Sequence, residues 1–259
     1  AAETPAAIAE WVRAIGGAAE LQAGKLRWVS LAATPVSDEQ LAFLARLDSL
    51  ESLDAQATQV GDLGLASLAN LASLRVLDLS NTTVSDSGLA HLAKLPNLEV
   101  LRLAGTLVEG PGLDRLRALP RLRELDLGAT KLEDRHMPAV GHLAGLRSLR
   151  LSYTEITDEG FKSVAGLRQL ETLHLAGTDI GDPSIAVIAQ LPALREINLN
   201  QARFTDAGLA PLKALANLEK IEMFRTLAGN ATAQTLAALP SLRFVRLDYT
   251  AVDDKGIAA

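Results

Sequence analysis

Hydrophobic positions recur with a fixed spacing along almost the whole chain. From residue 26 onward a leucine stands every 24 residues, and ten consecutive copies follow without insertion or deletion. A repeat of this length predicts a solenoid, in which each copy buries its apolar side against its neighbours. The repeated residues therefore serve the scaffold, and function must lie in positions that differ between copies. The leucines that head the copies are Leu26, Leu50, Leu74, Leu98, Leu122, Leu146, Leu170, Leu194, Leu218 and Leu242.

Each copy combines two hydrophobic periods, as the third copy illustrates. Leu77 and Leu79 alternate with Asp78 and Ser80, which is the two-residue period of a short strand with one buried face. Over residues 89–95 leucine recurs at three-residue spacing, which predicts the apolar stripe of a short helix. We therefore expect one strand and one short helix from every copy.

Aspartate fills the position just before the predicted helix in eight copies, and asparagine fills it in a ninth. Asp and Asn are favoured N-caps because their side chains accept hydrogen bonds from the unpaired amides of the first turn. We therefore expect these carboxylates to be helix caps and not catalytic acids. The residues are Asp38, Asp62, Asp86, Asp134, Asp158, Asp182, Asp206, Asp254 and Asn230.

Threonine fills the position where the chain turns out of the strand in every copy except the eighth, which has Ala202. A hydroxyl at such a turn can keep buried backbone groups paired, and we expect it to bond groups of adjacent copies. This role is structural. The column consists of Thr34, Thr58, Thr82, Thr106, Thr130, Thr154, Thr178, Thr226 and Thr250.

The combined pattern, L-x-x-L-x-L-x-x-T-x-V-x-D-x-G-L, resembles the leucine-rich-repeat family over residues 26–259. Threonine stands here where the family consensus has Asn or Cys, and the D-x-G-L stretches look like the 24-residue bacterial variety. The resemblance implies an α/β fold: a curved right-handed coil with a parallel sheet on its concave side and short helices on its convex side. It also implies a recognition or scaffold module, since most members are of that kind, although the family shares no single ligand.

The chain is expected to divide into an N-terminal helical cap, residues 1–25, and ten repeats over residues 26–259, the last one incomplete. Thr4-Pro5 is a helix-start signal, and residues 20–22 and 25–31 can form a leading hairpin. Terminal units of a solenoid need such shielding. The tenth copy stops at Ala259, partway through its helix. Either the natural chain continues, or the exposed end docks on something.

Composition removes several classes of function. A net charge of −6 across 259 residues argues against nucleic acid as a partner, because phosphate binding needs a basic stripe. No apolar run reaches the about 18 residues that span a bilayer, so no membrane insertion is expected. The chain has no cysteine and begins Ala-Ala-Glu-Thr-Pro in place of Met. Such small residues fit cleavage of an export signal, which favours a periplasmic or extracellular location over a cytoplasmic one.

No group of residues points to catalysis. His91, His136 and His142 fall on or beside helices of different copies, and neither a helical metal spacing nor a nucleophile motif is present. We therefore expect no enzyme activity, no catalytic residue, no metal and no cofactor.

The non-repeating strand positions carry the candidate site. Phe224, Phe244 and Tyr249 fall in the last two copies, although the chain has only nine aromatic residues. Aromatic and Arg side chains ringed by polar groups are typical of binding hot spots. Alternatively, the aromatic residues merely cover the end of the array. The candidate partner-binding residues are Tyr153, His174, Asn198, Asn200, Glu222, Phe224, Arg225, Phe244, Arg246 and Tyr249.

Three hypotheses follow for function. The first is a non-enzymatic scaffold that recognises a protein partner of unknown identity through its concave face. The second is a structural subunit or domain of a larger exported assembly, which docks through its uncapped C-terminal end. The third is a glycan-binding module. The oligomeric state is left open.

Overall fold

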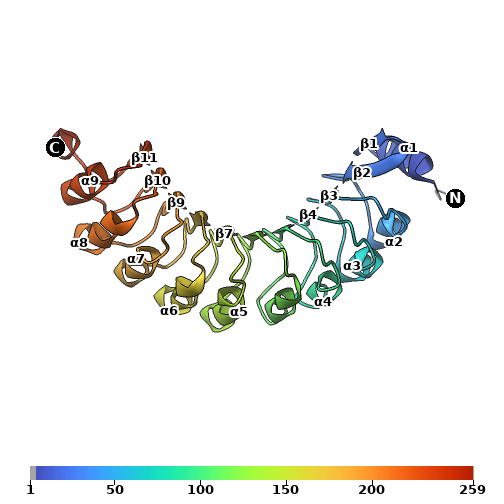
Figure 1. Cartoon of the computed structure of the whole chain (residues 1–259), viewed down its shortest axis with the longest axis horizontal. Helices are drawn as coiled ribbons and strands as arrows, with labels where there is room; N and C mark the ends of the chain where they lie inside the picture. The colour runs from blue at the N-terminus through green and yellow to red at the C-terminus, as the bar shows by residue number, and fades with distance from the viewer. Residues whose placement is uncertain (1–3, 259) are drawn as a thin grey trace. The chain divides into compact units, whose positions relative to one another are not determined.

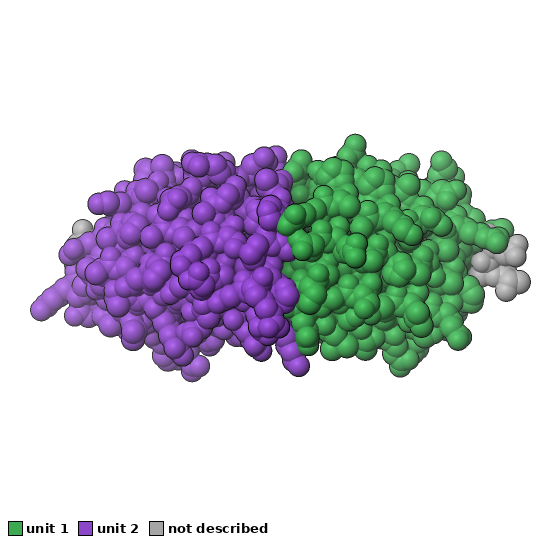
Figure 2. All heavy atoms as spheres, turned by 90° about the horizontal axis from the view of Figure 1, so that it is seen from below, with its two compact units in different colours: residues 1–130 green, residues 131–259 purple. Residues whose placement is uncertain are grey.

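The computed structural model describes residues 4–258 and contains two compact units, residues 1–130 and 131–259 (Figure 2). In each unit the strands lie on one side and the helical segments of the repeats on the other, whereas the first helix, α1, lies beside β1 at the N-terminal end (Figure 1). We call these sides the strand face and the helix face. The export prediction rests on the first residues of the chain and the incomplete last copy on Ala259, and these positions lie outside the described residues.

Unit 1 begins with a helix and an antiparallel hairpin, and continues with parallel strands. The Thr4 hydroxyl accepts a hydrogen bond from the Ala7 amide, and Pro5 follows in the first turn, so the helix begins where the sequence predicts. Strands β2 to β6 pair in sequence order, each parallel to the next. The elements are α1 (Pro5–Ala14), β1 (Ala18–Gln22), β2 (Lys25–Ser30), α2 (Asp38–Leu41), η1 (Ala42–Leu44), β3 (Ser52–Asp54), α3 (Asp62–Leu68), β4 (Val76–Asp78), α4 (Leu89–Leu92), β5 (Val100–Arg102), η2 (Leu113–Ala118) and β6 (Glu124–Asp126).

Unit 2 repeats one strand and one helical segment per copy. Strands β7 to β11 are also parallel and pair in sequence order. The helical segments are short, and several are 3₁₀ helices, labelled η. The elements are η3 (Asp134–His136), α5 (Met137–Gly141), β7 (Ser148–Arg150), α6 (Asp158–Phe161), η4 (Lys162–Gly166), β8 (Thr172–His174), α7 (Asp182–Ile188), β9 (Glu196–Asn198), α8 (Asp206–Leu209), η5 (Ala210–Ala214), β10 (Lys220–Glu222), α9 (Asn230–Ala237), β11 (Phe244–Arg246) and α10 (Asp254–Ile257).

The leucine columns form the core of each unit. Leu77 and Leu79 of the third copy are fully buried, and so are Leu89 and Leu92 of its helix. Val76 and Asp78, which alternate with Leu77 in β4, stay partly exposed, whereas Ser80 after the strand is buried. The two hydrophobic periods in the sequence therefore predict the strand, the helix and their buried sides correctly.

The aspartate column has a different role from the predicted one. In most copies the aspartate is the first residue of the helix, and its carboxylate accepts hydrogen bonds from the following copy. Asp86, for example, accepts from the amides of Glu109 (2.9 Å), Gly110 (3.0 Å) and Gly112 (2.7 Å). The capping prediction was wrong because the residue before the aspartate holds the N-cap position, as Thr157 does in α6.

In several copies a glycine at the position two residues after the aspartate column leaves room for these contacts. A methyl group at Gly88 would lie 2.5 Å from Oδ1 of Asp62 in the preceding copy, and one at Gly112 would lie 2.5 Å from the Asp86 carbonyl oxygen. In these copies the aspartate of one copy therefore packs against a glycine of the next.

The threonine column stabilises the turn of its own copy. The Thr82 hydroxyl donates to the Leu79 carbonyl (2.6 Å), three residues earlier, and every other member makes the equivalent bond. The prediction that these hydroxyls bond groups of adjacent copies was wrong, because the turn places a carbonyl of the same copy within hydrogen-bond distance.

One residue per copy, just before the threonine, has a left-handed backbone. The φ angles of these ten residues lie between 53° and 66°. Glycine adopts this conformation without strain, whereas other residues adopt it at a cost of about 1–2 kcal/mol. We call this set the left-handed row; it consists of Ala33, Ala57, Asn81, Gly105, Ala129, Tyr153, Gly177, Gln201, Arg225 and Tyr249.

Within each unit, charged residues of opposite sign alternate at the position before each strand. Arg75 and Glu99 form an ion pair at 2.9 Å on the surface of unit 1, and their neighbours repeat the arrangement. We call this the Arg/Glu ladder. Its ion pairs are Arg27–Glu51, Arg75–Glu99, Arg147–Glu171 and Arg195–Glu219.

Candidate binding surface

Aromatic and arginine side chains meet on the strand face of unit 2, where β10 and β11 end. The Phe224 and Tyr249 rings pack edge to face, with centroids 5.2 Å apart and planes at 84°. The guanidinium carbon of Arg225 lies 5.3 Å from the Phe224 centroid and 5.7 Å from that of Tyr249. Arg246 approaches the same Phe224 ring at 4.8 Å. We call these four residues the aromatic–arginine cluster.

Two members of the cluster belong to the left-handed row. Arg225 has φ 54° and Tyr249 has φ 57°. The backbone bond from the Arg225 amide to the Asp248 carbonyl (3.0 Å) holds the two copies together at this point. Bulky residues with positive φ are uncommon, and they persist where the surroundings fix them, often at functional sites.

Tyr153 is a third bulky member of the row, three copies before Arg225. Its side chain is 60% exposed and its backbone φ is 60°. A methyl group at Gly177 would lie 2.5 Å from Cδ1 of the Tyr153 ring. The ring therefore lies over the glycine of the next copy. Because adjacent strands are about 4.8 Å apart, Tyr153 is about 14 Å from Arg225 along the sheet.

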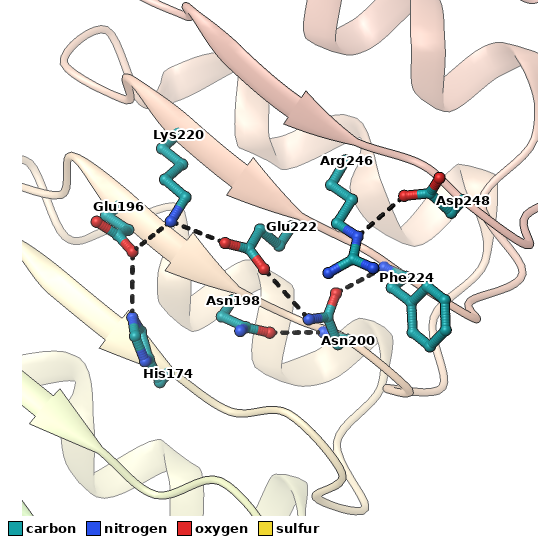
Figure 3. Close-up of polar contacts among 9 residues, drawn as sticks. All are labelled: His174, Glu196, Asn198, Asn200, Lys220, Glu222, Phe224, Arg246 and Asp248. Atoms are coloured by element: carbon teal, nitrogen blue, oxygen red, sulfur yellow. Dashed lines mark hydrogen bonds and ion pairs between the residues drawn. The ribbon is translucent and has the colours of Figure 1, made fainter.

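A polar network joins the strand residues beside the cluster (Figure 3). Lys220 Nζ lies 3.0 Å from Glu196 Oε1 and 2.8 Å from Glu222 Oε1. His174 Nε2 lies 3.3 Å from the same Glu196 oxygen. Three neighbouring strands thereby share one chain of contacts, which fixes the charged side chains on this face.

Asn200 links this network to the cluster. Its Nδ2 donates to Glu222 Oε2 (3.4 Å), and its Oδ1 accepts from the Phe224 amide (2.6 Å). The backbone amide of Asn200 donates to Asn198 Oδ1 (3.0 Å). The backbone that carries Phe224 is therefore held by a side chain of the preceding copy.

Hydrogen bonds within the network shift the pKa values of its charged residues. The hydrogen bond from Lys220 lowers the pKa of Glu222, and the bonds to Glu222 and Glu196 raise the pKa of Lys220. Partial burial acts to raise the pKa of Glu196, but hydrogen bonds from Lys220 and His174 outweigh it, so the net pKa is lowered. Both carboxylates and the ammonium group are therefore charged at neutral pH.

The last strand borders an apolar end surface. Val245 and Phe244 of β11 are 39% and 48% exposed, and Lys220 Nζ lies 5.5 Å from the Phe244 ring centroid. An open pocket of about 330 Å³ beside β11 is lined largely by apolar residues, among them Leu236, Leu239, Leu242 and Val245.

The structure distributes the predicted site residues over four places. Phe224, Arg225, Arg246 and Tyr249 form the cluster, whereas Phe244 lies at the apolar end and Tyr153 lies apart in the left-handed row. The remaining four belong to the polar network: His174, Asn198, Asn200 and Glu222.

The sequence reasoning missed four neighbours of these residues. Glu196 and Lys220 connect the network, Asp248 pairs with Arg246 at 2.9 Å, and Leu227, two residues after Arg225 in the chain, is 70% exposed. A comparison of the first strand position across copies would have found Glu196 and Lys220, since opposite charges there fall on adjacent strands. Leu227 could have been found as a leucine that stands outside the repeated apolar positions.

Neither a metal site nor a membrane helix stands out in residues 4–258. No three His, Cys, Asp or Glu side chains of this part of the chain come together as metal ligands. None of its helices has both the length and the apolar character needed to cross a bilayer.

Solved structures with the same fold come from bacteria and plants. An internalin from Listeria monocytogenes aligns with a TM-score of 0.60 at 18% identity, over 96% of this chain and 90% of the internalin. The Arabidopsis receptor kinase HAESA, solved with the peptide hormone IDA and a co-receptor, aligns with a TM-score of 0.65 at 19% identity. That alignment covers 90% of this chain and 44% of the receptor chain. At these identities the similarity shows the fold.

Family models agree with the structural comparison, although no curated protein matches the sequence. A model of a leucine-rich repeat region matches residues 111–258, and a single leucine-rich repeat model matches residues 70–93. The fold is thus the α/β leucine-rich-repeat solenoid that the 24-residue pattern predicts. The chain belongs to the leucine-rich-repeat family.

Proposed function

We propose that this protein is a non-enzymatic recognition scaffold, which binds a protein partner through the strand face of unit 2. The observation that carries the proposal is the aromatic–arginine cluster. It presents exposed Tyr249 and Arg225 side chains on a rigid sheet, beside a satisfied polar network. Binding hot spots are enriched in Tyr and Arg, and a pre-ordered surface loses little conformational entropy on binding.

Related folds support a protein partner. The receptor kinase HAESA was solved in complex with a peptide hormone and a co-receptor. For the present chain the concave face of the solenoid would be the strand face, and the ten predicted site residues lie on it or at its edge. Export to the periplasm or the cell exterior stays a prediction, which fractionation of the source cells tests.

The test compares three versions of the full chain as baits in an extract of the source organism. They are the parent, a double variant with Phe224→Asp and Tyr249→Asp, and a control with Leu63→Asp. Leu63 is 80% exposed on α3 in unit 1, so the control makes the same kind of change on the helix face. Circular dichroism first establishes that all three baits are equally folded.

A protein retained by the parent and the control, but lost by the double variant, is the expected result. Purified, it should bind the double variant at least about 30-fold more weakly than the parent, since a single hot-spot residue already contributes about 2 kcal/mol. Equal binding to all three versions would refute recognition through the cluster.

A second candidate function is docking into a larger assembly through the apolar end of unit 2. The exposed β11 and its apolar pocket favour it. Under this alternative, Ile257→Asp abolishes capture and the cluster variant does not, because Ile257 is 76% exposed at the pocket. Retention of a glycan, with no protein, would favour the glycan-binding alternative.

A further inference from the structure

Two guanidinium groups share the Phe224 ring, but only one of them has a carboxylate partner. Arg246 Nε lies 2.9 Å from Asp248 Oδ2. Arg225 lies over the Phe224 and Tyr249 rings, and its guanidinium forms no ion pair or side-chain hydrogen bond within the described part of the chain. The cluster therefore holds one positive charge for which residues 4–258 supply no counter-charge.

The nearby carboxylates are already engaged. Asp248 binds Arg246, whereas Glu196 and Glu222 both bind Lys220. The residues beside Arg225 in the left-handed row, Gln201 and Tyr249, contribute no carboxylate. Arg225 is thus available to an anion from outside.

The position of Arg225 prepares it for such a contact. The two rings hold the guanidinium on the surface, and the Arg225 amide is bonded to the next copy. Guanidinium is weakly hydrated and binds carboxylates in a two-pronged geometry. A carboxylate that arrives here gains charge-assisted hydrogen bonds, while little of the arginine side chain remains to be ordered.

Apolar surface lies next to this charge. Tyr249 is 76% exposed and Leu227, two residues after Arg225, is 70% exposed. A ligand that contacts Arg225 will therefore also meet the Tyr249 ring, and Leu227 offers exposed aliphatic surface two residues further along the chain.

We propose that Arg225 receives an acidic side chain of the protein partner, and that Tyr249 and Leu227 contact an apolar residue beside it. The inference rests on the proposed function and adds the chemistry of the partner. It predicts a segment in which Asp or Glu is followed or preceded closely by an aliphatic or aromatic residue.

The test pans a library of random linear dodecapeptides displayed on phage against the full chain. Parallel panning uses Arg225→Gln, and Arg168→Gln serves as the matched control because Arg168 is an exposed arginine of unit 2 outside both the cluster and the apolar pocket. We expect acidic peptides with adjacent apolar residues to be enriched on the parent and the control, but not on Arg225→Gln. Circular dichroism checks that the variants are folded.

Binding of one enriched peptide, synthesised with a fluorescent label, then measures the coupling between Arg225 and the acidic residue of the peptide. Arg225→Gln should weaken its binding about tenfold, the effect of losing about 1.4 kcal/mol from one charge-assisted contact. Replacing the acidic residue of the peptide by its amide should weaken binding to the parent equally, and should change binding to Arg225→Gln little.

The results separate this inference from the proposed function. Peptides that require Phe224 and Tyr249, but show no acidic bias or no dependence on Arg225, overturn the inference and leave the proposed function standing. Failure to enrich any peptide that requires the cluster, together with equal capture by the Phe224→Asp, Tyr249→Asp variant, overturns both.

Discussion

The aspartate bonds between copies predict a large effect of a single carboxylate. Asp86 accepts hydrogen bonds from three amides of the following copy, at 2.7 to 3.0 Å. A hydrogen bond to a charged group contributes about 1.5–3 kcal/mol when it is well buried. Here water can replace part of it because the site is partly exposed, so about 1 kcal/mol for each bond is appropriate. Asp86→Ala should therefore lower the free energy of unfolding by about 3 kcal/mol.

Urea denaturation followed by circular dichroism measures this loss. With a slope of about 3 kcal/mol per molar urea, the midpoint should fall by about 1 M. Asp254→Ala is the matched control, because Asp254 holds the same position in the tenth copy and no described copy follows it. Its midpoint should change by less than about a fifth of that amount, as expected for a surface substitution.

Equal effects of the two substitutions would refute the reasoning, since the loss would then come from the start of the helix and not from the bonds between copies. A change below about 0.5 kcal/mol for Asp86→Ala would refute it as well. Asp86→Asn retains one acceptor oxygen and should lie between the parent and Asp86→Ala.

Three further predictions concern the left-handed row, pH and the Arg/Glu ladder. Gly177→Ala should cost about 2 kcal/mol of unfolding free energy, from backbone strain and the approach to the Tyr153 ring, but only about half as much in a Tyr153→Ala background. Urea titration of the parent, the two single variants and the double variant measures this difference. An equal cost of Gly177→Ala in both backgrounds would exclude the ring contact. For Asp206, burial acts to raise the pKa, but hydrogen bonds from Thr232 and backbone amides outweigh it, so the pKa in the folded protein is lowered. Its stabilisation is complete above the unfolded pKa of about 4 and is lost as the pH falls through the folded value. Thermal unfolding from pH 7 to pH 3 should show this loss, and it should be smaller in Asp206→Asn. Arg75→Gln should lower the urea midpoint only slightly, and the difference should shrink in 1 M salt, because the Arg75–Glu99 pair is exposed.

The sequence predicted the scaffold well because the scaffold depends on local periods. Leucines such as Leu77 and Leu89 recur with the periods of a strand and a helix, and both are buried as expected. The same reasoning failed for Asp86 and Thr82, since a column of identical residues does not show whether its side chains bond within a copy or between copies. Only the three-dimensional stacking decides this.

Only some residues of the candidate site could be predicted from the sequence, because only some of them stand out by residue type. Phe224, Arg225 and Tyr249 stood out as aromatic or basic residues in positions that other copies fill differently. Lys220 and Asp248 were missed because their importance comes from partners on neighbouring strands and at the strand exit, not from their own type. The left-handed backbone of Arg225 could have been predicted from one feature of the sequence. The same column holds glycines at residues 105 and 177, and glycine prefers this conformation.

The alternation in the Arg/Glu ladder has a consequence for folding. Copies with nearly identical cores can stack in the wrong order during folding, for example with one copy looped out, and the leucine columns alone would not oppose this error. Skipping one copy would bring Arg27 next to Arg75, or Glu51 next to Glu99, so an attraction would become a repulsion. Like charges on adjacent strands are destabilising. Each exposed pair adds little to the stability of the correct fold, yet the column as a whole distinguishes neighbouring copies that are otherwise interchangeable. Within each unit the ladder thus favours the correct order of copies over one in which an inner copy is looped out, because that error places like charges side by side.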